Sequence, residues 1–217
     1  MGDTDRAAEN LGPMARLLGF GHPGKQGWRL VLMLMLGATL PLFALADWGG
    51  VDVPLNHDYA VLARLFIALP LLVLGGPQFD RLVSDAMGQV ARTGLLSGEA
   101  LAAHDRWAGK LRGLRGSNVA EGLFALSALL FGFWRVGLPG PLLGLSGWGY
   151  DASGALNAAG FWYGFGVLTL LRFLILLWMW RLLLWTLYMA KLAFLPLDLK
   201  PAHSDGAAGL GYLGFVQ

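Results

Sequence analysis

The sequence predicts an all-α integral membrane protein with four transmembrane helices and an intracellular amphipathic helical hairpin between the second and third. Hydrophobic residues make up 56% of the 217 residues and charged residues only 14%, against about 25% charged in ordinary soluble domains. Residues 161–196 form one apolar run that is interrupted only by Arg172, Arg181 and Lys191. Because so little charge cannot cover a soluble surface, lipid must cover part of this protein.

Four apolar segments are long enough to cross a hydrocarbon core of about 30 Å, which takes about 20 helical residues. The predicted spans are residues 28–48, 59–76, 118–138 and 158–181. We expect the second to stop at the turn signal Gly75, Gly76 and Pro77. The fourth is longer than a span requires, so its helix should continue into the cytoplasm to about residue 195. Gly160 and Gly164 form a GxxxG pattern at its outer end, a motif of close helix contacts.

The segment between the second and third spans, residues 78–116, has the pattern of a helical hairpin. Apolar residues recur at helical spacing from Phe79 to Val90, while Asp80 falls on the opposite face. This pattern predicts an amphipathic helix on the membrane surface or against partner helices. A turn near Ser97 and a second helix should follow.

The distribution of Lys and Arg predicts the orientation in the membrane. Four basic residues crowd the end of the hairpin: Arg106, Lys110, Arg112 and Arg115. The links at 49–58 and 138–157 contain no Lys or Arg, which is typical of external loops. The segment 28–196 is therefore a four-span domain between two cytoplasmic ends, the N-terminal segment 1–27 and the Gly-rich tail 197–217. The opening residues lack the pattern of a removable signal peptide, and the cell membrane is the expected location.

Arg172 lies about two-thirds of the way across the fourth span. A mid-membrane arginine is costly, so it should face a partner or a wet cavity. Glu121 is the acidic residue at comparable depth. The two are a candidate intramembrane pair, which either fixes helix register or forms part of a wetted ion site.

Arg181 falls at the inner interface, between Trp178 and Trp185 on one helix face. Cation–π contact with these rings and snorkelling to headgroups would account for it structurally. The alternative is specific binding of an anionic lipid of the inner leaflet by these three residues.

The tail contains a polar constellation of His203, Asp205, Gly206 and Gly209. An Asp–Gly pair is a common turn former, so a capped turn is one interpretation. The other is a cytoplasmic site in which His203 and Asp205 bind a metal or relay a proton, while glycine amides receive an anion.

Several classes of function lack their residues in this sequence. There are no cysteines, which excludes thiolate metal sites, Fe–S clusters and cysteine nucleophiles. The four histidines lie outside or at the edge of the spans, so a bis-histidine haem is disfavoured. No familiar catalytic motif occurs, and a formal net charge of +2 does not indicate nucleic acid as a partner. We therefore predict no catalytic, cofactor-binding or metal-binding residues.

The tail also carries a resemblance, in the sequence LPLDLKPAHSDGAAGLGYLGF. It is similar to an LDL, P-x-HPD and GGLGFL pattern, with Ser204 in place of the usual Pro and Ala208 in place of a usual Gly. The matching residues are Leu197, Asp198, Leu199, Pro201, His203, Asp205, Gly206, Gly209, Leu210 and Gly211. From about Pro70 onward the chain resembles a family of uncharacterised bacterial multi-pass inner-membrane proteins. The resemblance implies no activity, but it implies that relatives continue past Gln217.

Two classes of function remain. The first is a non-enzymatic membrane scaffold, sensor or subunit whose hairpin and tail meet a membrane or cytoplasmic protein partner. The second is a transport or ion-permeation protein with a polar site at Arg172 and Glu121. Because the spans contain few polar groups to solvate a substrate path, the first is favoured.

Overall fold

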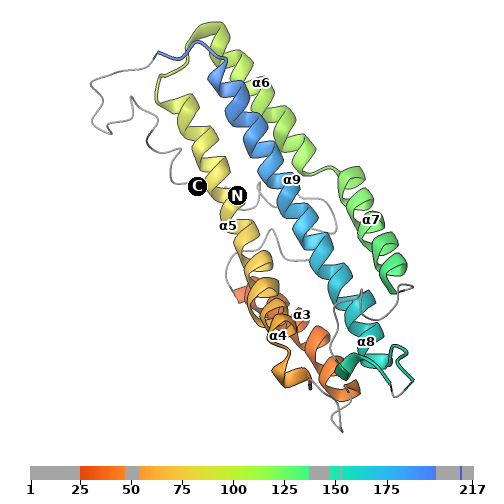
Figure 1. Cartoon of the computed structure of the whole chain (residues 1–217). Coiled ribbons are helices and arrows are strands. Elements are labelled where there is room, and N and C mark those ends of the chain that lie inside the picture. Colours follow the sequence, from red (N-terminus) through yellow and green to blue (C-terminus); the bar gives the residue numbers. More distant parts are fainter. Residues whose placement is uncertain (1–24, 47–53, 137–146, 152, 199–210, 212–217) are drawn as a thin grey trace.

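The computed structural model describes residues 25–46, 54–136, 147–151, 153–198 and 211, and these are helical with no strands. Four helical stretches in this part of the chain are long and apolar enough to cross a membrane. They are Trp28–Leu45, Tyr59–Arg92, Gly98–Arg135 and Ala158–Ala193. The protein is therefore all-helical and compatible with a multi-pass membrane protein, as the sequence predicts (Figure 1).

The central element is the last long helical stretch, which runs through α8 (Ala158–Phe161), the π-helical segment η5 (Trp162–Val167) and α9 (Leu168–Ala193). It extends along the length of the elongated bundle in Figure 1. The helix ends close to the end predicted from the length of the apolar run. All other long helices pack against it or against each other beside it.

Two layers of helices surround different halves of this central helix (Figure 1). In the first layer, α3 (Lys25–Leu45), the beginning of α5 (Leu69–Arg92) and α7 (Asn118–Val136) surround an apolar core that includes Leu42, Leu65, Trp148, Tyr163 and Leu174. In the second layer, the end of α5 and α6 (Gly98–Arg115) pack on the end of α9 around Val90, Leu111, Leu184, Tyr188 and Leu192.

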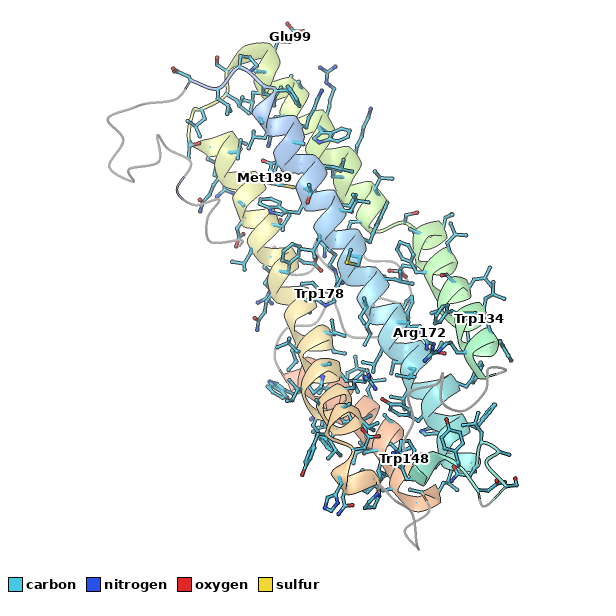
Figure 2. All side chains as sticks on the ribbon, viewed as in Figure 1. Glu99, Trp134, Trp148, Arg172, Trp178 and Met189 are labelled. Carbon is cyan, nitrogen blue, oxygen red and sulfur yellow. The ribbon has the colours of Figure 1, made fainter. Side chains whose placement is uncertain are left out.

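The predicted stop at Gly75, Gly76 and Pro77 is wrong, because α5 passes through all three residues without a break. A Cβ atom on Gly75 would lie 3.0 Å from the Trp178 ring, so this glycine permits a close approach of α5 and α9. The Trp178 indole donates a hydrogen bond to the Leu72 carbonyl at 2.9 Å, and Figure 2 shows the ring beside α5. The loss of one backbone hydrogen bond at Pro77 is tolerated because the helix is held by this packing.

The predicted turn near Ser97 separates α5 from α6. Gly94 and Gly98 have φ angles of 69° and 55°, a left-handed conformation that costs little only for glycine. The chain therefore reverses between Thr93 and Ser97, and both helices of the hairpin pack against α9. Of the two predicted placements for the amphipathic helix, packing against a partner helix is the one observed, and the partner is α9 of the same chain.

The opposite end of the bundle contains two π-helical segments that are linked to each other. η2 (Arg64–Ala68) follows the short helix α4 (Tyr59–Ala63), and Arg64 Nη1 donates a hydrogen bond to the Tyr163 hydroxyl of η5 at 3.0 Å. Asp58 accepts a hydrogen bond from the buried Trp148 indole at 3.0 Å. The first bond joins two long helical stretches near their beginnings, and the second fixes Trp148 to the start of one of them.

Gly160 of the GxxxG pattern lies against a loop backbone, while the segments that carry Gly160 and Gly164 also pack against α3. A Cβ atom on Gly160 would collide with the backbone carbonyl of Gly149. Gly149 belongs to a short 3-10 turn, η4 (Gly147–Gly149), that precedes α8. Gly160 is therefore needed where the start of the central helix lies against a loop.

Candidate functional site

A buried charge cluster lies where helices α5, α6 and α9 meet. The Asp80 carboxylate pairs with Arg115 at 2.6 Å through Oδ2 and with Arg181 at 3.3 Å through Oδ1. Asp80 is 7% exposed and Arg181 is 6% exposed. One carboxylate therefore bridges two guanidinium groups from different helices.

The charge cluster lies at the boundary between the two apolar cores. Along α5, Val73 belongs to the first core and Ala86 to the second, with Asp80 between them. Along α9, Leu177 and Leu184 flank Arg181 in the same way. The charges thus separate two apolar layers that share two continuous helices, α5 and α9.

Glu121 adds a fourth charge from α7. It is 4% exposed and lies close enough to Arg181 to attract it electrostatically. Two acidic and two basic groups then balance in formal charge. Buried charges are tolerated when they are paired in this way, whereas removal of one partner leaves an uncompensated charge. The cluster therefore couples the positions of four helices.

The end of α6 is held at the same level by a second contact. The Trp180 indole donates a hydrogen bond to the Leu114 carbonyl at 3.3 Å, and its ring packs edge-on against Phe124 of α7 at 5.8 Å between centroids. The connection between α6 and α7 thus lies against α9 beside the charge cluster.

Headgroup binding at Arg181, Trp178 and Trp185 stays a prediction, and the structure gives Arg181 a partner within the protein. Arg181 is buried against Asp80 instead of reaching solvent, and its guanidinium lies 5.9 Å from the Trp178 ring. Trp185 stacks on Tyr188 at 5.4 Å between centroids. Of the predicted roles, the cation–π contact with Trp178 is present, and a carboxylate from the neighbouring helix takes the place of the expected contact with water.

The structure does not bring Arg172 and Glu121 together. The Arg172 guanidinium lies 4.5 Å from the centroid of the Phe131 ring. Phe131 and Glu121 are separated by about 15 Å along α7, at a rise of 1.5 Å per residue. The described charge that acts on Arg172 is that of Arg135. Glu121 therefore lies near Arg181, whereas Arg172 lies in a different region of the α7–α9 interface.

The tail residues His203, Asp205, Gly206 and Gly209 lie outside the described residues. The two interpretations of this segment stay predictions. Among the residues that the structure describes, no group of three or more His, Asp or Glu side chains is placed to hold a metal ion.

Sequence reasoning missed Asp80 and Arg115 as site residues. The sequence pattern places Asp80 on the polar face of its helix, but Asp80 lies four residues after the buried Gly76 and three before the half-buried Val83, on the same side of the helix. An acidic residue that shares the spacing of the buried residues of its helix indicates a basic partner on a neighbouring helix. Arg115 was counted with the basic cluster of the hairpin, and nothing local distinguishes it from Arg112.

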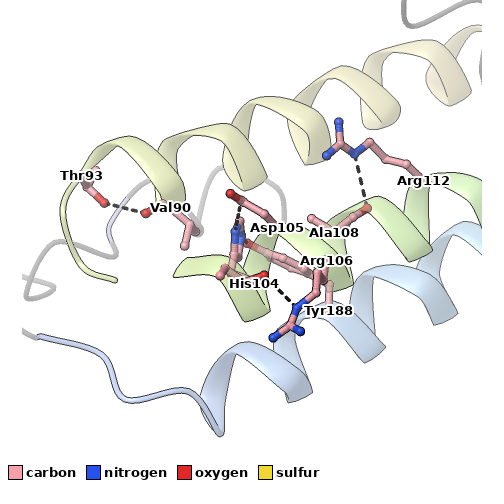
Figure 3. Close-up of polar contacts among 9 residues, drawn as sticks. Val90, Thr93, His104, Asp105, Arg106, Ala108, Arg112 and Tyr188 are labelled. Atoms are coloured by element: carbon pink, nitrogen blue, oxygen red, sulfur yellow. Dashed lines mark hydrogen bonds and ion pairs between the residues drawn. The ribbon is translucent and has the colours of Figure 1, made fainter. Parts of the chain in front are cut away.

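A second buried polar contact joins α6 to α9 within the second layer (Figure 3). His104 is 3% exposed, and its Nε2 lies 3.1 Å from the Tyr188 hydroxyl. Its Nδ1 lies 3.0 Å from the Asp105 carboxylate. Both ring nitrogens therefore have partners, and the pair anchors α6 to α9 beyond the charge cluster.

The charge cluster and the contact between His104 and Tyr188 are both suited to holding helices in register. Comparison with protein-family models, curated proteins and solved structures finds no match for this chain.

Proposed function

We propose that this chain is a non-enzymatic component of the bacterial inner membrane, a scaffold, sensor or subunit that presents its second helical layer to a protein partner. The observation that supports this most directly is the charge cluster of Asp80, Arg115, Glu121 and Arg181. It fastens the hairpin formed by α5 and α6 to the spanning helices, so that a partner bound to the hairpin is held at a fixed position above the bilayer.

The depth of the charge cluster supports a cytoplasmic second layer. At 1.5 Å per residue, Asp80 lies about 30 Å from Tyr59 at the start of its helical stretch. Arg181 lies about 35 Å from Ala158 by the same rise. These lengths match a hydrocarbon core of about 30 Å. The cluster would then lie at the inner interface, with the second layer beyond it.

The surface of α6 supports a partner-binding role. Arg106, Lys110 and Arg112 are exposed along this helix, and basic residues concentrate on the cytoplasmic side of membrane proteins. An acidic protein surface is the complementary partner for such a face. A transport role receives less support, because Arg172 and Glu121, on which it depended, lie apart.

The proposed orientation predicts a specific labelling pattern. Cysteine substitutions at Asp151 and Asp105, both exposed, should react differently with a membrane-impermeant maleimide in intact cells. Asp151→Cys should label from outside, and Asp105→Cys should label only after the membrane is permeabilised. The natural chain has no cysteine, so the unmodified protein is the blank. Labelling of Asp105→Cys in intact cells would invert the topology.

The partner-binding role predicts position-dependent crosslinking. A photoreactive amino acid at Arg106 on α6 should give a protein adduct of one defined mass in intact cells. The same group at Leu130, exposed on α7, should give no protein adduct because lipid covers that face. Charge reversal at Lys110 and Arg112 should reduce the α6 adduct. Equal adducts from both positions, or none from α6, would argue against a partner on this surface.

A further inference from the structure

The outer face of α9 stays apolar on both sides of the charge cluster. Along one side of the helix, exposed residues recur every three or four positions. This set, which we call the α9 stripe, consists of Ile175, Met179, Leu182, Leu183, Thr186, Leu187, Ala190, Ala193 and Phe194. The Thr186 hydroxyl donates a hydrogen bond to the Leu182 carbonyl at 2.8 Å. The one hydroxyl in the stripe is therefore already bonded within the helix.

The other two helices of the second layer have a different outer surface. In Figure 1, α9 lies between α5 and α6 in this layer, and both helices pack against it. Their outer faces are mostly charged or polar, with Arg81, Asp85 and Gln89 exposed on α5 and Arg106 and Lys110 exposed on α6. Such faces are suited to water. The α9 stripe is therefore the apolar side of the described part of the second layer.

The α9 stripe passes the level of the charge cluster. Ile175 and Met179 precede Arg181, and α9 continues for about 18 Å after Arg181 at 1.5 Å per residue. At the depth proposed for the cluster, the first part of the stripe faces lipid tails. The second part lies beyond them, where Leu187 is 41% and Phe194 86% exposed. Single exposed apolar residues are normal, whereas a contiguous apolar patch marks an interaction site.

A partner that covers the whole stripe must itself pass from the bilayer into the second layer. An acyl chain remains within the hydrocarbon core, and a soluble domain does not enter it. The partner is therefore a helix that leaves the membrane beside α9 and keeps an apolar side. The α9 helix of a second copy meets this condition, because it has the same stripe at the same depth. A two-fold axis along the membrane normal would place the two stripes together, so that each covers the other.

The residues of the stripe suit a pair of parallel helices. Spacings of three and four residues are those of helices that cross at a small angle. Thr186 and Ala190, near the middle of the stripe, are small enough for two backbones to approach, and Leu183 and Leu187 lie beside them. Arg172 precedes the stripe, and its guanidinium lies over the Phe131 ring of α7 at 4.5 Å. The contact would therefore begin after Arg172.

We propose that two copies of this chain form a parallel dimer through the α9 stripe, at the inner leaflet and beyond it. The dimer rests on the depth proposed for the charge cluster, since only that depth places Leu187 and Phe194 outside the lipid tails. It uses a different surface from the basic face of α6. Both copies therefore keep that face free for the acidic partner proposed above.

Cysteine crosslinking in isolated membranes tests the dimer. The natural chain has no cysteine, so each disulfide must come from the introduced residues. Under mild oxidation, Thr186→Cys and Ala190→Cys should each give a product of twice the mass of the chain. Gln89→Cys on α5 and Lys110→Cys on α6, both exposed in the same layer, are the controls and should stay monomeric. A product of another mass, or no product from either stripe position, would overturn the proposal.

Leu187→Glu tests the strength of the same contact in detergent solution. It should raise the dissociation constant of the dimer about tenfold or more, because the contact would bury a carboxylate without a partner. Mass photometry measures the fraction of dimer at each concentration. Leu82→Glu, at a position 44% exposed on α5, is the matched control and should leave the constant unchanged. Equal weakening by both variants, or a natural protein that is monomeric, would contradict the dimer.

The two proposals can fail separately. The crosslink reports contact between two copies on whichever side of the membrane the second layer lies. Labelling of Asp105→Cys reports the side and does not depend on the number of copies. An inverted labelling pattern therefore rejects the orientation, and absence of the crosslinked product rejects the dimer.

Discussion

Replacing Asp80 by asparagine is expected to lower the free energy of unfolding by about 3–5 kcal/mol, which is the usual cost of breaking a buried ion pair on one side. The substitution keeps the shape of the side chain but leaves Arg181, 6% exposed, without its carboxylate. The loss should appear as a lower melting temperature of the detergent-solubilised protein. Because Asp80 joins three helices, we also expect faster proteolysis between α5 and α6.

Two variants make this result specific. Asp85→Asn removes an exposed acid from the same helix, and it should change stability by less than about 0.5 kcal/mol, as surface substitutions usually do. Asp80→Leu combined with Arg181→Met replaces the pair by apolar groups, which is often neutral or stabilising at buried sites. Arg115 and Glu121 are then the remaining charges of the cluster; they are opposite in sign, and Arg115 at 22% side-chain exposure is partly accessible to water. Equal melting temperatures for Asp80→Asn and Asp85→Asn would show that the charge cluster does not hold the layers together.

Gly160→Ala should destabilise the first layer by about 1–3 kcal/mol, the typical cost of overpacking a filled site. The added Cβ would collide with the Gly149 carbonyl, a backbone atom that cannot rotate away. The loop carrying Trp148 should then shift and weaken the hydrogen bond from its indole to Asp58. Thermal unfolding followed by tryptophan fluorescence measures both effects.

Gly122→Ala is the matched control for this substitution. Gly122 also lies within a helix, but nothing lies within 4 Å of an added Cβ. Alanine is favoured over glycine in a helix by about 1 kcal/mol, so the melting temperature should rise slightly. If both alanine variants are stabilised, the contact between Gly160 and the η4 turn is not tight in the protein.

The long helices could be predicted from the sequence because their signal is local. A continuous apolar run such as residues 161–196 must satisfy its backbone groups internally in lipid, and a helix does this without other segments. The turn near Ser97 was also readable, since Gly94 and Gly98 permit the left-handed backbone that the reversal uses. The ends predicted for α7 and α9 lie close to the observed ones, whereas the end predicted for the second span does not.

The apparent breaks in the pattern were misleading where a distant residue decided them. Gly75 and Pro77 have the composition of a turn, yet Trp178 from another helix packs against the glycine and holds the segment helical. Gly160 likewise fits a helix-contact motif, and its neighbour is a loop backbone. A glycine permits both a turn and a close approach, so the sequence does not distinguish the two.

By itself, the sequence determined that this protein is helical, that it has four stretches able to cross a membrane, and where a hairpin interrupts them. Only the tertiary structure decided which charges meet. Arg181 pairs with Asp80, and Arg172 lies at Phe131 and not beside Glu121. The physical reason is that apolar burial depends on residues of one segment, whereas an ion pair depends on the rotation and height of two helices, which packing alone sets.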